Sequence, residues 1–497
     1  MKSRIWLPFG HRAFAVTVLL ALLLGGCAVA PRESRSPLVG QDDELGACAR
    51  LYRQVDTAVA RAGVRDAGSF RVAGFPWLRV DRFLASFRDE PMSEPAFQQW
   101  VAHMRALDRQ ARAAELGRLP DIQSLPGGNA AALQARLARC AQTLRAARLG
   151  DEAGRAALRA AAVAQDEYSQ LGRAFGGYPL SRYLVLYGVS SWQARERQAV
   201  QLQSPERDWG AVYAPPPASA PRQPVITARD ALGVPRLSAE QLQEWLHWYA
   251  PVFVVEQASA ADRPGAPRWG DRGPEVDASR PRVYTRLSFT RWQGEVLPQL
   301  NYGIWFDARP AKGPLDLLAG RLDGLNVRIT LTSRGEVLLV DSIHHCGCYH
   351  RHFPAPALVA RADPAYAEPP LVHPNLDWAP AGRRLVLGLK AGTHYIRRAG
   401  TVARDDLRGQ VYDFADYDSL RQLPLKDGGR SLFDEYGLVP GTERAERWFF
   451  WPTGVPEPGA MRQWGRHVTG FVGRRHFDDP DLLERIFEAR GDVADGQ

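Results

Sequence analysis

The residues most able to do chemistry are concentrated in one nine-residue segment. Residues 344–352 read HHCGCYHRH, and they include four of the chain's eleven histidines and two of its five cysteines. Thiolate sulfur and imidazole nitrogen are the ligands that zinc and copper select. The segment directly follows an apolar run at 337–343 that is typical of a strand, and a strand end positions side chains rigidly. The pattern therefore indicates a metal or redox site.

The ligands of this site depend on the backbone conformation. If the strand continues, alternate side chains face the same side, with about 6 to 7 Å between neighbouring Cα atoms on that face. The residues that would share this face are His344, Cys346, Cys348, His350 and His352. Gly347 would allow a bend that adds a third ligand to a pair. We therefore expect a zinc or copper site to be built from these five residues.

Two other interpretations of the segment stay open. Cys346 and Cys348 could form a Cys-x-Cys disulfide, which would be strained and easily reduced. Alternatively, the histidines could only form hydrogen bonds and stack in a loop. The cysteine spacing matches neither a zinc finger nor the Cys-x-x-Cys-His of a c-type haem site.

A second polar group lies near the C-terminus. Arg474 and Arg475 could bind a carboxylate or phosphate in two-point geometry, and His467 or His476 could transfer a proton. Together with His394, these residues could support the metal ligands or bind an anion. The competing interpretation is that Arg–Asp pairs tie the C-terminal segment to the sheet.

The two cysteines Cys48 and Cys140 suggest a disulfide. Each lies on the apolar stripe of a predicted helix. If the chain is exported to an oxidising compartment, a bridge between them would link two helices. The alternative is a pair of unpaired buried thiols, which fit an apolar core.

The elements that hold these residues divide into two unlike halves, which predicts an α+β fold. Residues 42–203 show apolar residues at three- and four-residue steps, with Ser93 as an N-cap and a helix beginning near Asn129. This pattern indicates an α-helical bundle. A proline-rich stretch within residues 204–235 predicts an extended linker.

Residues 236–497 are expected to form a mainly antiparallel β-rich domain. Strand-like runs at 283–292 and 296–306 flank a Gln-Gly-Glu turn, and runs at 326–332 and 337–343 flank a second turn. Further short strands are predicted at 384–389, 394–397 and 447–451, and a short helix at 481–489. One helix precedes them, with Ser238 and Gln241 in a capping-box pattern. Successive hairpins favour a sandwich or an open barrel.

The first 26 residues have the pattern of a secretory signal. Lys2, Arg4 and Arg12 precede a short apolar run at 13–24, which is too short to span a membrane. Leu-Gly-Gly then leads to Cys27, and this order resembles the lipobox of bacterial lipoproteins. The resemblance implies that Cys27 is the lipidated N-terminus of the mature chain. It also implies outer-membrane retention, because alanine rather than aspartate follows, with residues 27–41 as a flexible tether and the body in the periplasm.

Composition sets limits on function. The net charge is +8, the arginines are dispersed, and no basic block indicates nucleic-acid binding. The sequence contains no His-Glu-x-x-His, Gly-x-Ser-x-Gly, Walker or dinucleotide motif. Two functions stay open: an outer-membrane lipoprotein with a His/Cys metal or redox site, and a non-catalytic envelope lipoprotein that binds a protein or polysaccharide partner.

Overall fold

The computed structural model describes residues 44–206, 208–219, 225–378, 382–404, 406, 409–426 and 428–491. The predicted signal at 1–26, the lipidated Cys27 and the tether at 27–41 lie outside these residues. Within the described residues, the fold combines helices with mainly antiparallel sheets, so the expected α+β class is correct.

The N-terminal part is mostly helical. Its helices are α2 (Glu44–Arg61), α3 (Arg82–Ala85), α4 (Glu94–Leu116), α5 (Ala130–Arg148) and α6 (Glu152–Ala161). Ser93 caps α4 as predicted, and α5 begins next to Asn129 as predicted; the two side chains accept hydrogen bonds from the Ala96 and Ala132 amides. A hairpin of β1 (Phe70–Val72) and β2 (Phe75–Val80) packs against α4, and this hairpin was not expected from the sequence.

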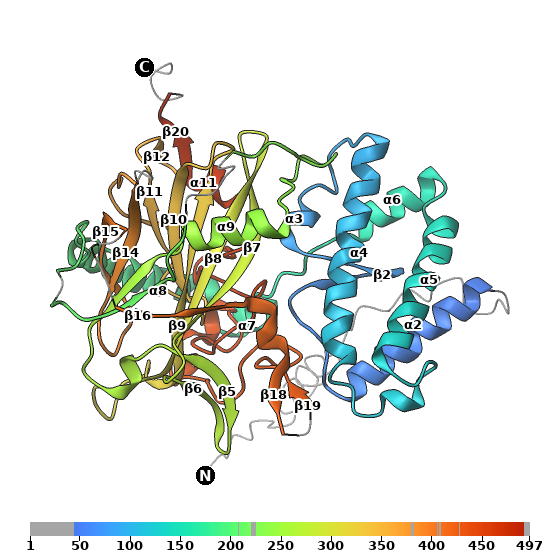
Figure 1. Cartoon of the computed structure of the whole chain (residues 1–497), viewed down its shortest axis with the longest axis horizontal. Helices are drawn as coiled ribbons and strands as arrows, with labels where there is room; N and C mark the ends of the chain where they lie inside the picture. The colour runs from blue at the N-terminus through green and yellow to red at the C-terminus, as the bar shows by residue number, and fades with distance from the viewer. Residues whose placement is uncertain are drawn as a thin grey trace, which may run out of the picture.

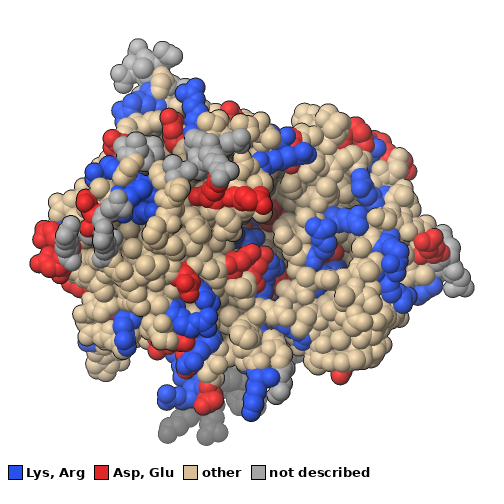
Figure 2. Space-filling view, viewed as in Figure 1, with Lys and Arg blue, Asp and Glu red and all other residues tan. Residues whose placement is uncertain are grey.

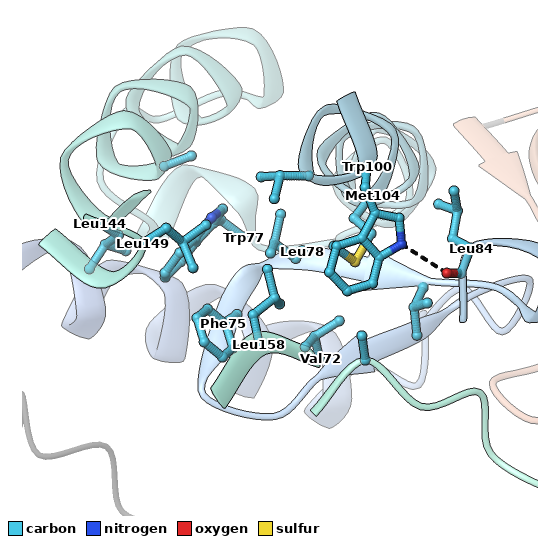
Figure 3. Packing of buried hydrophobic residues seen from close by; sticks show 14 of the residues in the cluster. Val72, Phe75, Trp77, Leu78, Leu84, Trp100, Met104, Leu144, Leu149 and Leu158 are labelled. Atoms are coloured by element: carbon cyan, nitrogen blue, oxygen red, sulfur yellow. Dashed lines mark hydrogen bonds between the residues drawn. The ribbon is translucent and has the colours of Figure 1, made fainter. Parts of the chain in front are cut away.

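One apolar core joins these helices to the hairpin (Figure 3). Trp77 and Trp100 are fully buried in it, and the Trp100 indole donates a hydrogen bond of 2.8 Å to the Leu84 carbonyl. Cys48 on α2 and Cys140 on α5 form a disulfide with a Cα–Cα distance of 5.1 Å. The predicted bridge between two helices is therefore confirmed.

Two large sheets form the remainder and lie beside the helical part (Figure 1). The seven-stranded sheet has the order β13-β11-β10-β9-β8-β7-β17 and the five-stranded sheet the order β15-β14-β4-β3-β16. The first contains β7 (Arg282–Trp292), β8 (Glu295–Arg309), β9 (Gly320–Leu331), β10 (Val337–His344), β11 (Arg351–Pro354), β13 (Leu371–Val372) and β17 (Asp413–Asp416). The second contains β3 (Ala211–Ala214), β4 (Val252–Val255), β14 (Arg383–Leu389), β15 (Ile396–Ala403) and β16 (Gln410–Val411).

The long strands β7 to β10 pair antiparallel in sequence order, which confirms the two predicted hairpins. Parallel pairs occur where β13 and β17 join the first sheet and where β4 meets β14. Residues of both sheets, such as Phe253 and Leu387 from one and Tyr302 and Val327 from the other, share one hydrophobic core. The sheets are thus packed against each other, and α9 (Ala239–Trp248), with its predicted capping box, contributes Trp245 to the same core.

Small elements complete the C-terminal part. They are η2 (Ala260–Asp262), β5 (Ala266–Gly270), β6 (Gly273–Asp277), β12 (Leu358–Ala360), η3 (Tyr417–Gln422), β18 (Leu423–Leu425), β19 (Gly428–Arg430), α11 (Leu482–Ile486) and β20 (Phe487–Ala489). The strand expected at 447–451 is wrong, because α10 (Arg447–Phe450) and η4 (Trp451–Thr453) occupy it. The helix predicted at 481–489 is shorter in the structure, where α11 ends at Ile486. The chain continues as β20, which pairs with β12.

Two helices from before the proline-rich stretch pack on the C-terminal part. They are α7 (Gln170–Phe175) and α8 (Tyr178–Ala199), which contact η4, and α8 also contacts β13. Within the described residues, no helix is both long enough and apolar enough to cross a membrane. Basic and acidic side chains are interspersed on the face that Figure 2 shows.

Candidate functional site

The histidine–cysteine segment reverses direction instead of continuing as a strand. β10 ends at His344, β11 begins at Arg351, and the two strands pair antiparallel with Asp341 opposite His352. The reversal uses left-handed backbone at Gly347 (φ +90°) and Tyr349 (φ +63°). A Cβ atom at Gly347 would lie 2.5 Å from the Val468 carbonyl oxygen, so only glycine fits there. The expectation of one extended face is therefore wrong.

The hairpin brings together a different set of ligands. One ligand atom from each of Asp341, His350 and His352 lies within 4.8 Å of the other two, and all three residues are buried. His350 Nε2 lies 2.8 Å from Asp341 Oδ2, and the two imidazole ring centroids are 4.1 Å apart. These three residues form the candidate metal centre, which we call the Asp–His–His group.

Asp341 also has a cationic partner. Arg328 Nε and Nη2 donate to its two oxygens at 2.9 and 2.5 Å, and the guanidinium lies 3.8 Å from the centroid of the Phe477 ring. Burial raises the pKa of Asp341, but Arg328 and His350 outweigh this effect and hold it below its usual value. The carboxylate is therefore ionised in the folded protein.

The two histidines each leave one ring nitrogen without a hydrogen-bond partner. His350 Nε2 contacts Asp341, and His352 Nδ1 lies 3.2 Å from the Leu371 carbonyl oxygen. His350 Nδ1 and His352 Nε2 have no partner, although both atoms are buried. Burial lowers the pKa of His350 to about 4 and holds the pKa of His352 well below its usual value. Both rings are therefore neutral, which is the form that binds metal ions.

The two cysteines do not join this group. The structure contains Cys346 and Cys348 as free thiols, the first buried and the second partly buried. Cys346 packs among apolar side chains that include Trp305 and Met461. A hydrogen bond between the two thiols lowers the pKa of Cys346. The prediction that Cys346 and Cys348 are metal ligands is therefore corrected, because neither belongs to the Asp–His–His group. The alternative Cys346–Cys348 disulfide is not formed in this structure.

His344 and His394 belong to a separate buried network around Asp323. Their Nδ1 atoms lie 3.3 and 2.8 Å from the two oxygens of that carboxylate, and Arg444 Nη2 lies 3.2 Å from it. Burial opposes ionisation of Asp323, but Arg444 and the two histidines hold its pKa well below the usual value. His344 is therefore not a ligand of the Asp–His–His group, and His394 supports His344 rather than that group.

The C-terminal candidates are also dispersed. Arg474 points outward and pairs with Asp166 at 2.9 Å, whereas Arg475 is buried and pairs with Glu368 at 3.2 Å. The two arginines therefore do not form one anion clamp. His476 lies 3.0 Å from Glu167, and His467 is buried beside Phe477. The interpretation that these pairs fasten the C-terminal segment fits the structure best.

A cavity of about 460 Å³ lies next to the Asp–His–His group. His350 reaches its wall, so the group and the cavity are adjacent. Much of the wall is apolar, from Leu184, Val189 and Trp192 of α8 together with Phe450 and Phe471. The polar part of the wall includes Cys346, Cys348, Tyr349, His350, Glu368, Tyr395, Glu446 and Arg475.

Glu446 gives the polar part of the cavity an acidic group. Burial raises its pKa, while Arg444 and Arg309 only partly offset that rise. Its Oε1 atom is buried without a hydrogen-bond partner. A cavity with an apolar wall and a few unsatisfied polar atoms is typical of a binding site for an amphiphilic molecule.

Sequence reasoning missed Asp341, Glu368 and Glu446. Asp341 carries a usable signal, because it is the only charged residue within the apolar run at 337–343. Glu368 and Glu446 lie in segments with no such pattern. Comparison of the chain with family models, with curated proteins and with solved structures finds no match.

Proposed function

We propose that this chain is a lipid-anchored envelope protein that holds a zinc or copper ion at the Asp–His–His group, beside a cavity for an amphiphilic ligand. The observation that carries the proposal is the pair of buried, unpartnered nitrogens, His350 Nδ1 and His352 Nε2. A buried lone pair without a partner is costly unless a ligand satisfies it.

The surroundings of the two rings support this assignment. Metal-binding histidines usually donate their other N–H to a carboxylate or a backbone carbonyl, which fixes the ring. Asp341 and the Leu371 carbonyl occupy these positions. Because Asp341 already accepts from Arg328 and lies against His350 Nε2, we assign the ion to His350 Nδ1 and His352 Nε2, with Asp341 fixing the His350 ring from its other side.

The cavity suggests what such a site would act on. A bound metal lowers the pKa of a coordinated water and so supplies a nucleophile near neutral pH. His350 links the group to the cavity, whose apolar wall suits a hydrocarbon tail and whose polar part suits a head group. We therefore propose hydrolysis or binding of an amphiphile as the activity of this site.

Elemental analysis of the protein, purified without a histidine tag and never exposed to chelator, tests the metal proposal. We expect close to one equivalent of zinc or copper. His352→Gln should abolish it, whereas His247→Gln should retain it, because the control histidine stacks on Phe414 and lies outside the Asp–His–His group. Less than about a tenth of an equivalent in the unmodified protein would rule the site out.

A non-catalytic envelope lipoprotein is the second candidate. It is favoured by the Asp323 network, in which His344 and His394 act as buried structural partners. In that case the segment 344–352 would only stabilise the fold, with an envelope protein or polysaccharide as the partner. Full metal occupancy would argue against this candidate.

The anchor is proposed from the signal and lipobox pattern that ends at Cys27. It would place the body in the periplasm at the outer membrane, with residues 42–203 as a helical bundle and 236–497 as the β-rich domain. Cys27→Ala should leave an unprocessed precursor. An unchanged mobility of the wild-type protein in globomycin-treated cells would contradict lipidation.

A further inference from the structure

Exposed apolar side chains are concentrated on one part of the surface. Nine of the sixteen large exposed hydrophobic residues in the described chain come from residues 171–187 and 448–451. They are Leu171, Phe175, Leu180, Tyr183, Leu184, Tyr187, Trp448, Phe449 and Trp451, and we call them the aromatic face. Soluble proteins rarely expose so many large apolar side chains together, so we expect the aromatic face to be a binding surface.

The first half of α8 contributes a regular stripe to the aromatic face. Leu180, Tyr183, Leu184 and Tyr187 follow the three- and four-residue spacing that normally faces a protein core. Here their side chains are between 59% and 80% exposed. The helix thus has the sequence of a buried element but turns its apolar stripe outward.

Local contacts make the aromatic face continuous across distant segments of the chain. The Ser169 amide donates to the Gly454 carbonyl at 2.7 Å, and Arg173 Nε donates to the Thr453 carbonyl at 2.7 Å. A Cβ atom at Gly176 would lie 2.4 Å from the Pro452 side chain. These contacts hold α7 and the start of α8 against η4, so the two groups of exposed side chains are neighbours.

The charges next to the aromatic face are mainly basic. Residues 169–195 contain Arg173, Arg182 and Arg195 and no acidic residue. Residues 447–456 contain one charged residue, Arg447, which pairs with Glu457 at 3.2 Å. Trp and Tyr rings beside arginines are typical of proteins that lie at a membrane interface, where anionic head groups attract the basic side chains.

We infer that the aromatic face lies against the surface of a lipid bilayer that contains anionic lipid. The cavity then opens toward the bilayer, because Leu184 belongs to the aromatic face and also lines the cavity. Phe450, which precedes Trp451 of the aromatic face, lines the cavity as well. The inference deepens the proposed function, since it makes a membrane lipid the source of the amphiphilic ligand. It rests on the proposed anchor only for delivery of the protein to the membrane, since the seventeen peptide links from Cys27 to Glu44 can span up to about 60 Å.

The same charges argue against a second copy as the occupant. A two-fold dimer through the aromatic face would bring the same surface of each chain together. Arg182, which is exposed, would then approach its own equivalent with no acidic residue of 169–195 to compensate. Like charges across an interface are unfavourable, whereas anionic lipid neutralises them.

Vesicle flotation of the unlipidated chain 28–497 tests the inference. Removal of residues 1–27 takes away none of the contacts described above, all of which lie within 44–491. The probes are vesicles of phosphatidylethanolamine with and without phosphatidylglycerol. We expect the wild type to float with both, and more with phosphatidylglycerol. Leu180→Ser/Tyr187→Ser/Trp448→Ser should weaken binding at least about tenfold.

Matched controls separate this result from misfolding and from the other proposals. Val411→Ser/Leu425→Ser/Tyr436→Ser removes three exposed apolar side chains elsewhere and should bind like the wild type, with unchanged thermal unfolding. Arg182→Gln should weaken binding only to vesicles with phosphatidylglycerol. The inference would be overturned if the wild type did not float, or if the control variant lost vesicle binding to the same extent. Dimerisation through the aromatic face without vesicle binding would also overturn it. Because lipidation is absent from this assay, its outcome is independent of Cys27.

Discussion

The buried arginines of the helical part and the buried histidines of the sheet differ in how completely their atoms are paired. Every guanidinium nitrogen of Arg79 and Arg112 has an acceptor, shared between carboxylates and backbone carbonyls. Arg79 pairs with Glu115 at 2.8 Å, and Arg112 with Asp108 at 2.8 Å. Such a paired network holds α4 to the β1–β2 hairpin and leaves its cations nothing further to bind.

The Asp–His–His group is equally buried but only partly paired. His350 and His352 each use one nitrogen and leave the other without a partner. Burial alone therefore does not distinguish a structural polar cluster from a ligand site. The Asp–His–His group differs in that its unpartnered ring nitrogens lie beside a carboxylate and next to a cavity, where a ligand could satisfy them.

The disulfide of the helical part gives the largest expected effect. Cys48 and Cys140 are 92 residues apart, and a bridge that closes a loop of this size stabilises a fold by about 4 to 5 kcal/mol. Cys48→Ala/Cys140→Ala should therefore lower the free energy of unfolding in urea by about this amount. Reducing agent should destabilise the wild type similarly and leave the double variant unaffected. Unchanged stability in the variant would show that the bridge contributes little.

Breaking the paired arginine network should have nearly as large an effect. Arg79→Met leaves Glu115 and Asp108 buried with one cation fewer, which costs about 3 to 4 kcal/mol. Urea unfolding measures this loss, and Arg182→Met, at an exposed arginine, should change it by less than about 0.5 kcal/mol. If the two variants behaved alike, the network would not hold the helical part together.

The His476 ion pairs should make stability fall in alkaline solution. Burial lowers the pKa of His476, but Asp479 and Glu167 outweigh it and raise the pKa to about 9. A raised pKa contributes stability that is complete below about pH 6.5 and is lost as the pH rises through 9, about 3 kcal/mol in all. Unfolding between pH 6 and 10 should show this loss. His476→Gln should be less stable at pH 6 and should lack this pH dependence; a parallel profile would exclude the ion pairs as its cause.

The smallest effect is expected at the thiols. Cys346→Ser places a hydroxyl in an apolar cluster and should cost about 1 to 2 kcal/mol without changing metal content. Thermal unfolding and elemental analysis of the same preparation check both parts. Loss of the metal in this variant would restore Cys346 as a ligand and contradict the Asp–His–His assignment.

The sequence predicts much of this fold because its signals are local. Capping side chains at Ser93 and Ser238, the Gln-Gly-Glu turn at 293–295 and the apolar stripes that carry Cys48 and Cys140 all act within a few residues of themselves. Local sequence also singled out the segment 344–352, which supplies two of the three residues of the Asp–His–His group. These predictions needed no knowledge of tertiary contacts.

The errors arise where tertiary contacts decide. The alternating side-chain pattern of residues 344–352 does not reveal that Gly347 lies against the Val468 carbonyl. It therefore does not predict that the chain reverses there. The reversal places His350 and His352 beside Asp341 of the preceding strand and leaves the cysteines outside this group. Residues 447–451 have the aromatic content of a strand, yet they form α10 and η4 and expose their rings. Their placement follows from packing against α7 and α8.

Cobalt(II) substitution tests the central claim most directly, because the absorption spectrum reports both binding and the ligand type. We predict visible d–d bands at one equivalent, without the charge-transfer band that a thiolate ligand gives. The bands should disappear in His352→Gln and persist in His247→Gln and Cys346→Ser. A thiolate charge-transfer band, or a wild-type spectrum no different from that of cobalt in buffer, would contradict the assignment of a metal centre to Asp341, His350 and His352.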